Sequence, residues 1–453
     1  MQNLSLAGQQ ILVLGMGVSG RSAAEFLLTC GALVCGVDQD VHLLDTHFDI
    51  QRLKKKGLRI LPQCNISALS QFDFLVLSPG IPSSHSLVQL ATQAQIPIVG
   101  EIELGCRFVK DPILGITGTN GKTTVTLLVA HILNHCGQPA KALGNVGSPL
   151  THELLNLAPF IEELHSTIIL ELSSYQIETL YHPSLDAAII LNITPDHLDR
   201  YKTMEAYARA KCAIERALKR DGQLYIEEEA WRQFGSQIKH HSPRLYGYEK
   251  TSFIHTDLKG VFRDQERVFE LPAHLQNKRT HEIENILAAY ALCADRGVTG
   301  QLFLEAFKTF KKPPHRIEFV SEVKGVRYYD DSKGTNFDAV VRAVEVLEGP
   351  IILIAGGVDK GFSYTPWLEK FNGKVKLICA IGQAADKIEE QLGTQLPVIL
   401  LNSLEEAVHQ AARFAQKGEA VLLSPGCSSF DMFKDYIHRG NEFQRIVGQL
   451  TER

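Results

Sequence analysis

The chain has 453 residues, which is too many for one ordinary hydrophobic core, so we expect two to four domains. Apolar residues make up 45% and charged residues 21%, which are ordinary values for a folded protein and argue against disorder. The formal charge of −5 argues against a nucleic-acid-binding protein, because such proteins usually carry a basic excess. No apolar stretch reaches the ~18 residues that cross a bilayer, so we expect no membrane partner.

The nine cysteines are scattered along the chain and form no Cys-x-x-Cys pair. This pattern predicts neither a zinc site nor a disulfide framework, and it is typical of reduced thiols in the cytosol. The first eight residues also lack the basic and apolar regions of a signal peptide. We therefore expect a cytoplasmic protein.

The first hundred residues alternate short apolar runs with amphipathic stretches. The apolar runs at 10–14, 32–37 and 74–77 have the pattern of buried strands, and residues 21–28 are helical in composition. This alternation predicts a parallel sheet covered by helices.

A second block with the same alternation begins near residue 112. Its expected strands are 113–116, 167–170 and 187–191, and its expected helices are 123–136, 205–219 and 281–297. Residues 227–269 are polar and poorly periodic, so we expect only mixed strands and loops there.

Pro313 and Pro314 mark the clearest boundary in the chain, because prolines end a helix and stiffen a linker. Beyond them the expected strands are 351–355, 377–381, 398–401 and 420–423. We therefore predict an α/β protein of three domains, each built on a mostly parallel sheet, at residues 1–111, 112–313 and 314–453.

The first candidate site is the run Gly15-Met16-Gly17-Val18-Ser19-Gly20, which follows a strand and begins a helix. Glycines there let the backbone approach a pyrophosphate, and Asp38 at the end of the next strand can accept a hydrogen bond from a sugar hydroxyl. The motif alone is compatible with a nicotinamide dinucleotide, with another nucleoside diphosphate, or with a tight turn that binds nothing.

The run from Gly115 to Thr124, Gly-Ile-Thr-Gly-Thr-Asn-Gly-Lys-Thr-Thr, is more specific. Successive backbone N–H groups in such a turn point at phosphate oxygens, and the helix dipole adds a favourable potential. Lys122 can neutralise the terminal phosphates, and the Thr123 hydroxyl can bind Mg²⁺. Gly115 lies one residue too early for a strict Walker A sequence, so the run indicates a variant ATP loop.

Two polar residues follow further strands of the second block. Glu171 comes after the strand at 167–170, and His197 comes shortly after the strand at 187–191. Open α/β sheets bind ligands at the carboxyl ends of their strands. A carboxylate and an imidazole near a phosphate loop therefore indicate a metal site, although Mg²⁺ prefers oxygen ligands. Taken alone, Lys211 is typical of a surface lysine and Asn145 of a turn.

The third block carries four polar loops, each next to an apolar strand or the linker. They are residues 314–318, 330–336, 356–361 and 424–431. Their cationic and hydroxyl groups suit a second, carboxylate-bearing substrate.

Together these motifs resemble those of the Mur ligases, the ATP-dependent amino-acid-adding enzymes of bacterial cell-wall synthesis. The resemblance covers essentially the whole chain and is carried by residues 15–20 with Asp38, 78–82, 117–124, 171–176, 192–201, 331–336 and 424–436. It points to the D-glutamate-adding members, since the Asp-Asn-Pro-Arg motif of the diaminopimelate-adding members is absent. A folylpolyglutamate-synthase-like ligase would share the ATP loop but not the turn at Gly15.

The resemblance implies a Rossmann-like domain for the UDP substrate, a P-loop-like ATPase domain and a Rossmann-like C-terminal domain. It implies contacts to UDP-N-acetylmuramoyl-L-alanine for Gly15, Met16, Gly17, Val18, Ser19, Asp38, Ser78, Gly80, Asn145 and His197. It implies contacts to ATP for Gly118, Thr119, Asn120, Gly121, Lys122, Thr123, Thr124, Val125, Asn285, Arg316 and Asp331. It implies contacts to D-glutamate for Lys333, Thr335, Lys360, Ser429 and Phe430.

The resemblance also implies catalytic roles for Lys122, Glu171, His197 and Lys211 with two Mg²⁺ ions. Lys122 would stabilise the transferred γ-phosphoryl group, Thr123 and Glu171 would bind one Mg²⁺, and His197 would bind the other. Lys211 matches a lysine that this family carbamylates, which would convert a cation into an anionic metal ligand. One position departs from the family pattern His-Asn-x-x-Asn, because Glu282 replaces the first asparagine.

The implied reaction activates a carboxylate as an acyl phosphate and joins it to the amine of D-glutamate, in peptidoglycan synthesis. We expect a monomer. Two other function classes stay open at this point. An NAD-dependent oxidoreductase would explain the Gly15 turn with Asp38 but leave residues 118–124 unexplained, and a non-catalytic ATP-binding protein is favoured only by Glu282.

Overall fold

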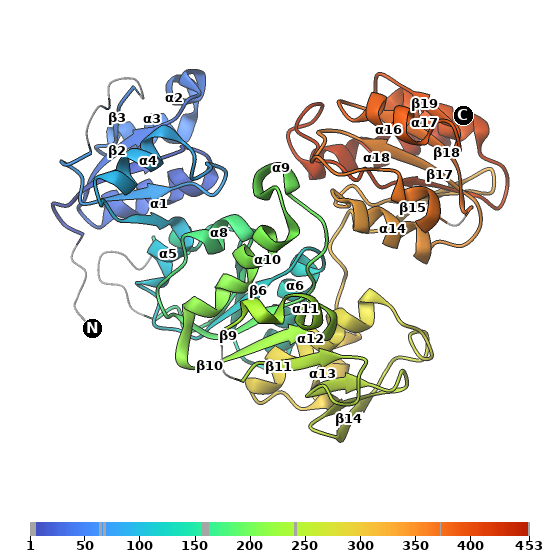
Figure 1. Cartoon of the computed structure of the whole chain (residues 1–453), viewed down its shortest axis with the longest axis horizontal. Helices are drawn as coiled ribbons and strands as arrows, with labels where there is room; N and C mark the ends of the chain where they lie inside the picture. The colour runs from blue at the N-terminus through green and yellow to red at the C-terminus, as the bar shows by residue number, and fades with distance from the viewer. Residues whose placement is uncertain are drawn as a thin grey trace. The chain divides into compact units, whose positions relative to one another are not determined.

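The computed structural model describes residues 6–62, 66, 69–155, 163–239, 242–371 and 373–451 (Figure 1). The described residues form three sheets and divide into two compact units. The first unit comprises residues 1–193 and 208–310, and the second comprises residues 194–207 and 311–453. The expected α/β class with three mostly parallel sheets is confirmed. Cys64 lies outside the described residues, and the other eight cysteines are free thiols.

The first sheet is entirely parallel and has the strand order β3-β2-β1-β4-β5. Its strands are β1 Gln10–Leu14, β2 Leu33–Val37, β3 Arg59–Ile60, β4 Phe74–Leu77 and β5 Ile98–Gly100. Its helices are α1 Val18–Thr29, α2 Val41–Thr46, α3 Phe48–Lys55, α4 Ser86–Gln93 and α5 Glu101–Cys106. Apolar side chains on both faces of β1 are buried, as expected of a parallel strand covered on both sides.

The second sheet, also in the first unit, has the order β14-β13-β12-β11-β10-β9-β6-β8-β7, and its pairs are parallel except that β13 is antiparallel to both β12 and β14. Its strands are β6 Ile113–Thr117, β7 Ala140–Gly144, β8 Thr167–Glu171, β9 Leu185–Ile190, β10 Leu218–Glu227, β11 Arg244–Gly247, β12 Ile254–Thr256, β13 Gly260–Arg263 and β14 Glu266–Glu270. Its helices are α6 Lys122–His135, α7 Leu150–Leu154, α8 Ser174–Glu178, α10 Met204–Cys212, α11 Glu228–Phe234, α12 His281–Asp295 and α13 Gly300–Phe307, with 3₁₀ turns at Ala213–Ala217 and Gly235–Gln237.

The expected helix at 205–219 is confirmed up to residue 217, as the α-helix α10, which ends at Cys212, followed by the 3₁₀ turn Ala213–Ala217. Its last two residues are wrong, because β10 begins at Leu218, which pairs with Leu185 of β9. Strand pairing in the sheet overrides the local helical composition, which is a weak determinant by itself. The stretch 227–269 contains the short strands expected there and also the helix α11, which the polar composition did not indicate.

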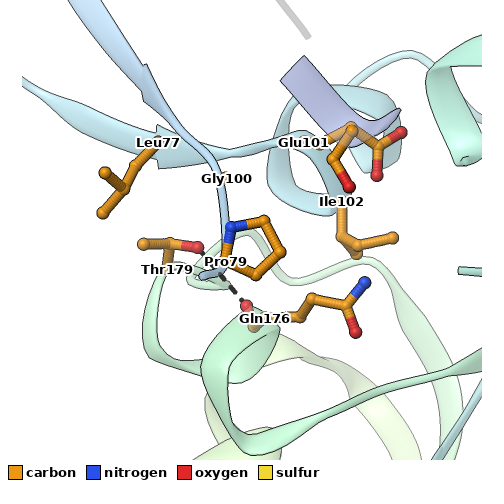
Figure 2. Close-up of a pocket in the computed structure, with 8 residues that line it drawn as sticks. Leu77, Pro79, Gly100, Glu101, Ile102, Gln176 and Thr179 are labelled. Carbon is orange, nitrogen blue, oxygen red and sulfur yellow. Dashed lines mark hydrogen bonds between the residues drawn. The ribbon is translucent and has the colours of Figure 1, made fainter. Parts of the chain in front are cut away.

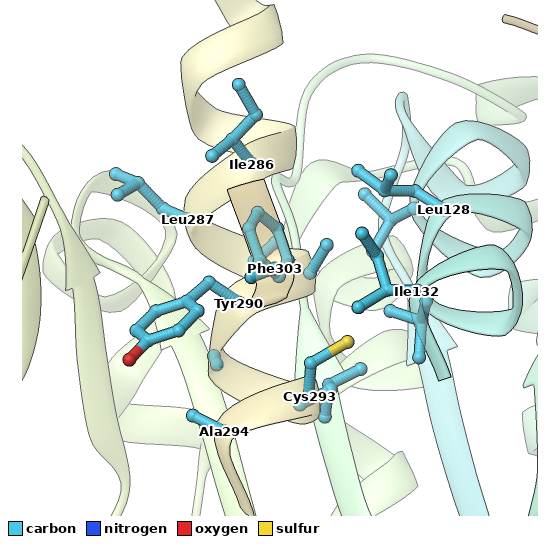
Figure 3. Close-up of a cluster of buried hydrophobic side chains, with 14 of the residues drawn as sticks. Leu128, Ile132, Ile286, Leu287, Tyr290, Cys293, Ala294 and Phe303 are labelled. Atoms are coloured by element: carbon cyan, nitrogen blue, oxygen red, sulfur yellow. The ribbon is translucent and has the colours of Figure 1, made fainter. Parts of the chain in front are cut away.

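The helices α6 and α12 pack against each other beside the second sheet (Figure 3). Leu128 and Ile132 of α6 face Ile286 and Cys293 of α12, and Phe303 of α13 completes the cluster. Full burial of each large apolar side chain contributes roughly 1.5–3 kcal/mol. This packing fixes the start of α6, where the phosphate loop ends.

The third sheet belongs to the second unit and has the order β15-β16-β20-β17-β18-β19, with β15 antiparallel to β16. Its strands are β15 Glu318–Val323, β16 Val326–Asp330, β17 Ile351–Gly356, β18 Val375–Ile381, β19 Val398–Leu400 and β20 Ala420–Leu423. The helices of this unit are α9 Leu198–Tyr201, α14 Phe337–Val346, α15 Pro366–Lys370, α16 Ala385–Leu392, α17 Leu404–Phe414 and α18 Tyr436–Thr451. Among the described helices, none combines the length and the apolar composition that a membrane crossing requires.

Candidate active site

The predicted phosphate loop connects β6 to α6 at the carboxyl end of the second sheet. Gly118 and Gly121 have φ values of +151° and +85°, and a Cβ at either position would collide with Leu191 or Asn285. Only glycine adopts these conformations without strain, so the loop turns sharply and α6 begins at Lys122. The first turn of a helix has N–H groups without intrahelical acceptors, and such groups bind phosphate.

Asn192, just beyond β9, holds the loop from the neighbouring strand. Its carbonyl accepts a hydrogen bond from Thr119 N at 2.8 Å, and its Oδ1 accepts one from Asn120 N at 2.8 Å. Its Nδ2 donates in return to the Asn120 carbonyl at 3.1 Å. The sequence motifs alone assign no role to Asn192 itself. The available signal was its place at the carboxyl end of a strand that pairs with β6.

Two lysine ammonium groups converge on the Gly118 carbonyl. Lys122 Nζ donates to the carbonyls of Gly118 at 2.9 Å and Thr119 at 2.8 Å, and Lys211 Nζ donates to Gly118 at 2.7 Å. Lys211 is only 1% exposed, so it is not the surface lysine that its helix suggests in isolation. Two cations this close repel each other, and an anion beside them is stabilised by both.

Glu171 ends β8, next to β6, and lies beside the phosphate-loop strand in the sheet. Its Oε1 accepts a hydrogen bond from Asn145 Nδ2 at 2.7 Å, and its backbone carbonyl accepts one from Asn145 N at 2.9 Å. Its Oε2 is buried and has no hydrogen-bond partner among the described residues. A buried carboxylate oxygen without a donor is costly, and a hard divalent cation such as Mg²⁺ would satisfy it.

The other residues predicted to contact ATP in this unit lie around the same loop. Asn285, in the second turn of α12, has its Oδ1 against Gly121. Thr123 and Val125 are buried in the first turn of α6, and Thr124 is half-buried. Glu282 lies in the first turn of α12, one residue after the helix begins.

The glycine turn after β1 is organised by Asp38. Its Oδ2 accepts a hydrogen bond from Met16 N at 2.6 Å, and its Oδ1 accepts one from Asp40 N at 3.0 Å. Ser78 Oγ donates to the Gly15 carbonyl at 2.8 Å, and Gly20 packs so closely on that carbonyl that no Cβ fits. The residues predicted to contact UDP follow three different strands and therefore lie next to one another in the fold.

The remaining residues predicted for this turn are on its surface. Gly17 is the N-cap of α1, Val18 is 65% exposed, and Gly80 is exposed in the loop after β4. Ser19 lines a small pocket of about 10 Å³, which holds about one water. Figure 2 shows Pro79 on one side of this pocket and Gln176 of α8 on the other.

The same pocket is bordered by Glu101, the first residue of α5. Its carboxylate accepts hydrogen bonds from Thr151 N at 2.6 Å and Thr151 Oγ1 at 2.8 Å, and Ser22 Oγ lies 2.7 Å from Thr151 Oγ1. Burial raises the pKa of Glu101 to about 7. This buried chain of polar groups joins α1 and α5, which belong to the first sheet, to α7, which belongs to the second.

His197 belongs to the second unit, whereas Glu171 belongs to the first. The preceding residue, Asp196, is buried and accepts a hydrogen bond from Lys360 Nζ at 3.0 Å. Asn336 Nδ2 lies 3.4 Å from the other carboxylate oxygen of Asp196. These contacts attach the segment 194–207 to the loops that follow β16 and β17.

The residues predicted to contact D-glutamate lie in three loops at one edge of the third sheet. Lys333 and Thr335 follow β16, Lys360 follows β17, and Ser429 and Phe430 follow β20. These three strands are neighbours in the order β16-β20-β17, so their carboxyl ends meet. Lys333 Nζ lies 3.8 Å from the centre of the Tyr436 ring. Ser429 is buried, and Phe430 is 73% exposed.

Two residues predicted to contact ATP lie beside these loops. Asp331 accepts a hydrogen bond from Ser424 Oγ at 2.7 Å, and burial raises its pKa to about 7. Arg316 is close enough to oppose that rise electrostatically. Arg439 of α18, which belongs to none of the sequence motifs that predict site residues, contacts two of the three loops.

Three family models match successive parts of the chain. The N-terminal domain of MurD-like Mur ligases matches residues 9–100, the Mur ligase middle domain matches 116–293, and the Mur ligase glutamate ligase domain matches 315–427.

Curated relatives match over nearly the full length. The UDP-N-acetylmuramoylalanine–D-glutamate ligase of Protochlamydia amoebophila is 52% identical over 443 residues, 98% of each chain. The ligase of the same name from Caldanaerobacter subterraneus is 36% identical over 468 residues, 99% of this chain and 100% of the relative.

Solved structures share the fold. The UDP-N-acetylmuramate-alanine ligase MurC of Thermotoga maritima has a TM-score of 0.60 at 18% identity and covers 97% of this chain and 99% of that one. The MurF ligase of Thermotoga maritima in complex with ADP has a TM-score of 0.58 at 14% identity and covers 100% and 99%. The chain therefore belongs to the Mur ligase family, as a relative of its UDP-N-acetylmuramoylalanine–D-glutamate ligases.

Proposed function

We propose that this chain joins D-glutamate to UDP-N-acetylmuramoyl-L-alanine at the expense of ATP, in the cytoplasmic stage of peptidoglycan synthesis. The observation that carries the proposal is the 52% identity with a curated ligase of that name over 98% of both chains. Identity at this level and length covers all three sheets and every loop described above. The alternative function, an NAD-dependent oxidoreductase, would not explain the loop that contains Lys122 or the burial of Lys211 beside it.

The proposed division of labour follows the three sheets. Residues 1–111 bind the UDP part of the substrate at the Asp38 turn, residues 112–313 bind ATP at the Gly118 loop, and residues 314–453 supply the D-glutamate loops. Asn285 from the first unit and Arg316 and Asp331 from the second bind the nucleotide, and Asn145 and His197 contact the muramoyl-alanine part.

The reaction must overcome the poor electrophilicity of a carboxylate. An oxygen of the alanine carboxylate attacks the γ-phosphorus of ATP, and ADP leaves with the electron pair of the broken P–O bond. The deprotonated amine of D-glutamate then attacks the carbonyl carbon of the acyl phosphate. Inorganic phosphate leaves with the electrons of the C–O bond, and the amide remains.

The chain's own task is to neutralise and align negative charge during the first of these steps. Lys122 Nζ lies at the Gly118 and Thr119 carbonyls, where it can move to the phosphoryl oxygens when ATP enters. The first-turn N–H groups of α6 supply fixed donors without reorganisation. Such preorganised contacts account for much of the rate enhancement in phosphoryl transfer.

The donors available for Mg²⁺ fit that ion. The unpartnered Oε2 of Glu171 and the hydroxyl of Thr123 are oxygen donors, which Mg²⁺ prefers. We propose a second ion held by His197 and by Lys211, the latter in carbamylated form, because an unmodified ammonium would repel the metal. Bound Mg²⁺ supplies Lewis-acid charge stabilisation to the phosphates.

The test is phosphate release from ATP in the presence of UDP-N-acetylmuramoyl-L-alanine and a panel of amino acids that includes both glutamate enantiomers. We expect release to require the precursor and D-glutamate together and to depend on Mg²⁺. Release that any amino acid supports equally, or that proceeds without the precursor, would contradict the proposal. We also propose a monomer, to be checked by sedimentation of the active protein.

A further inference from the structure

Arg439 is a charged residue that the reaction described above does not use. It lies in the first turn of α18 and is only 1% exposed, and it is among the largest fully buried side chains of the described residues. Burial lowers the pKa of its guanidinium to about 10, so the group remains charged at neutral pH.

The guanidinium bridges two of the three loops predicted to hold D-glutamate. Its Nη2 donates to the carbonyls of Ser332 at 2.9 Å and Cys427 at 3.2 Å. Its Nε donates to Ser332 Oγ at 3.0 Å, and its Nη1 donates to the Cys427 carbonyl at 3.3 Å. The third loop approaches the same group, since a Cβ on Gly357 would lie 3.4 Å from Nη1.

Within the part of the chain that the structure describes, the buried charge has no ion-pair partner. Among the described residues, no carboxylate lies within 4.0 Å of the guanidinium, and Asp330, Asp331 and Asp431 act on it only at longer range. Each of those carboxylates accepts a hydrogen bond from another group. Burying a charge without a direct counterion is costly, and an apolar side chain of similar volume would fill this space at lower cost. Packing alone therefore does not account for an arginine here.

Each loop contact is close in sequence to a residue predicted to bind the amino acid. Ser332 precedes Lys333, Cys427 lies two residues before Ser429, and Gly357 lies three residues before Lys360. A planar group with five donors can fix two backbone segments at once, which an ammonium group cannot do.

We propose that Arg439 is a positioning residue for the amino-acid substrate, which sets the loops 331–335 and 424–430 relative to each other. This inference rests on the proposed function, because it takes D-glutamate as the ligand of these loops. Arg439 acts through the loops and touches neither the substrate nor the reacting atoms.

The test compares Arg439→Met and Arg439→Lys with Arg445→Met. Arg445 is in the same helix but is half-exposed and pairs with Glu442, so it is the matched control. We expect Arg439→Met to raise KM for D-glutamate at least about tenfold, with KM for ATP and for the UDP precursor unchanged within about twofold. Arg439→Lys restores part of the loss, and Arg445→Met changes nothing.

A second readout does not depend on activity. Hydrogen exchange of the ligand-free protein should speed up in residues 331–335 and 424–430 of both Arg439 variants and not in the control. Where Arg439→Met fails to fold, Arg439→Lys gives the same two readouts.

The outcomes separate the two proposals. A wild-type protein without D-glutamate-dependent phosphate release would defeat the proposed function, and loop exchange would still test Arg439. An active wild type whose Arg439 variants keep KM for D-glutamate, or raise all three KM values alike, would overturn the role of Arg439. Unchanged exchange in both loops would overturn it as well.

Discussion

The turn after β1 and the turn after β6 both connect a buried strand to a helix through glycines, yet they carry opposite charges. In the first turn the carboxylate of Asp38 accepts a hydrogen bond from Met16 N. In the second turn the ammonium groups of Lys122 and Lys211 donate to the Gly118 carbonyl. The two turns therefore share a backbone architecture but differ in the charge beside their glycines, and the positive charge marks the turn that we propose binds the phosphates of ATP.

The comparison predicts the largest effect for Lys122. Removing its charge from the second turn should lower kcat by about 10²–10³-fold, because one preorganised electrostatic contact to the transition state is lost. Lys122→Ala should keep the circular dichroism spectrum and unfolding midpoint of the wild type. Normal turnover by the folded variant would show that the cation of this turn has no part in the reaction.

A smaller effect is expected for the acid next to the second turn. Glu171→Gln leaves a neutral oxygen in place of the unpartnered carboxylate oxygen. The Mg²⁺ concentration for half-maximal ADP formation should rise at least about tenfold, as for other changes in metal-binding groups. Glu153→Gln, in the nearby α7, is the control. An unchanged Mg²⁺ requirement would mean that Glu171 holds no metal.

Changing the charge of the first turn should affect only the UDP substrate. Asp38→Asn weakens the hydrogen bond from Met16 N and loosens the turn, so KM for the UDP precursor should rise about tenfold. KM for ATP should stay the same in this variant. In Asp45→Asn, an exposed control in α2, KM for the UDP precursor and KM for ATP should both be unchanged. A rise in KM for ATP would mean that the two turns do not act separately.

The last prediction concerns stability and not turnover, at the buried link from Glu101 of α5 to Thr151 of α7. The folded-state pKa of Glu101 is raised from 4.5 to about 7, so between these values the folded chain holds a proton that the unfolded chain has lost. Stability should therefore fall as pH rises from about 5 to 8, and this carboxyl accounts for about 3 kcal/mol at most.

Glu101→Gln removes that titration. The difference in unfolding free energy between wild type and variant should shift between pH 5 and pH 8 by an amount of this order. Glu270→Gln, at an exposed surface ion pair, should give no such shift. Parallel pH profiles for wild type and Glu101→Gln would contradict the assigned burial.

The sequence predicts the two turns because their residues are contiguous. A strand, spaced glycines and Lys122 form a local pattern, and Glu171 is found from its place at a strand end. The burial of Lys211 is not predictable in this way, because its acceptor, the Gly118 carbonyl, lies 93 residues away. The contacts of Arg439 are even harder to predict from the sequence, because its partners Ser332 and Cys427 come together only in the folded sheet. Sites formed by contiguous residues can therefore be predicted from the sequence, whereas contacts between residues that are far apart in the chain cannot.

The proposed reaction requires that the carboxylate of the precursor is activated by phosphorylation. The decisive experiment uses UDP-N-acetylmuramoyl-L-alanine labelled with oxygen-18 in the alanine carboxylate, incubated with ATP, Mg²⁺, D-glutamate and the protein. We expect the released phosphate to carry one labelled oxygen for each peptide bond formed. Product formation with unlabelled phosphate would contradict it.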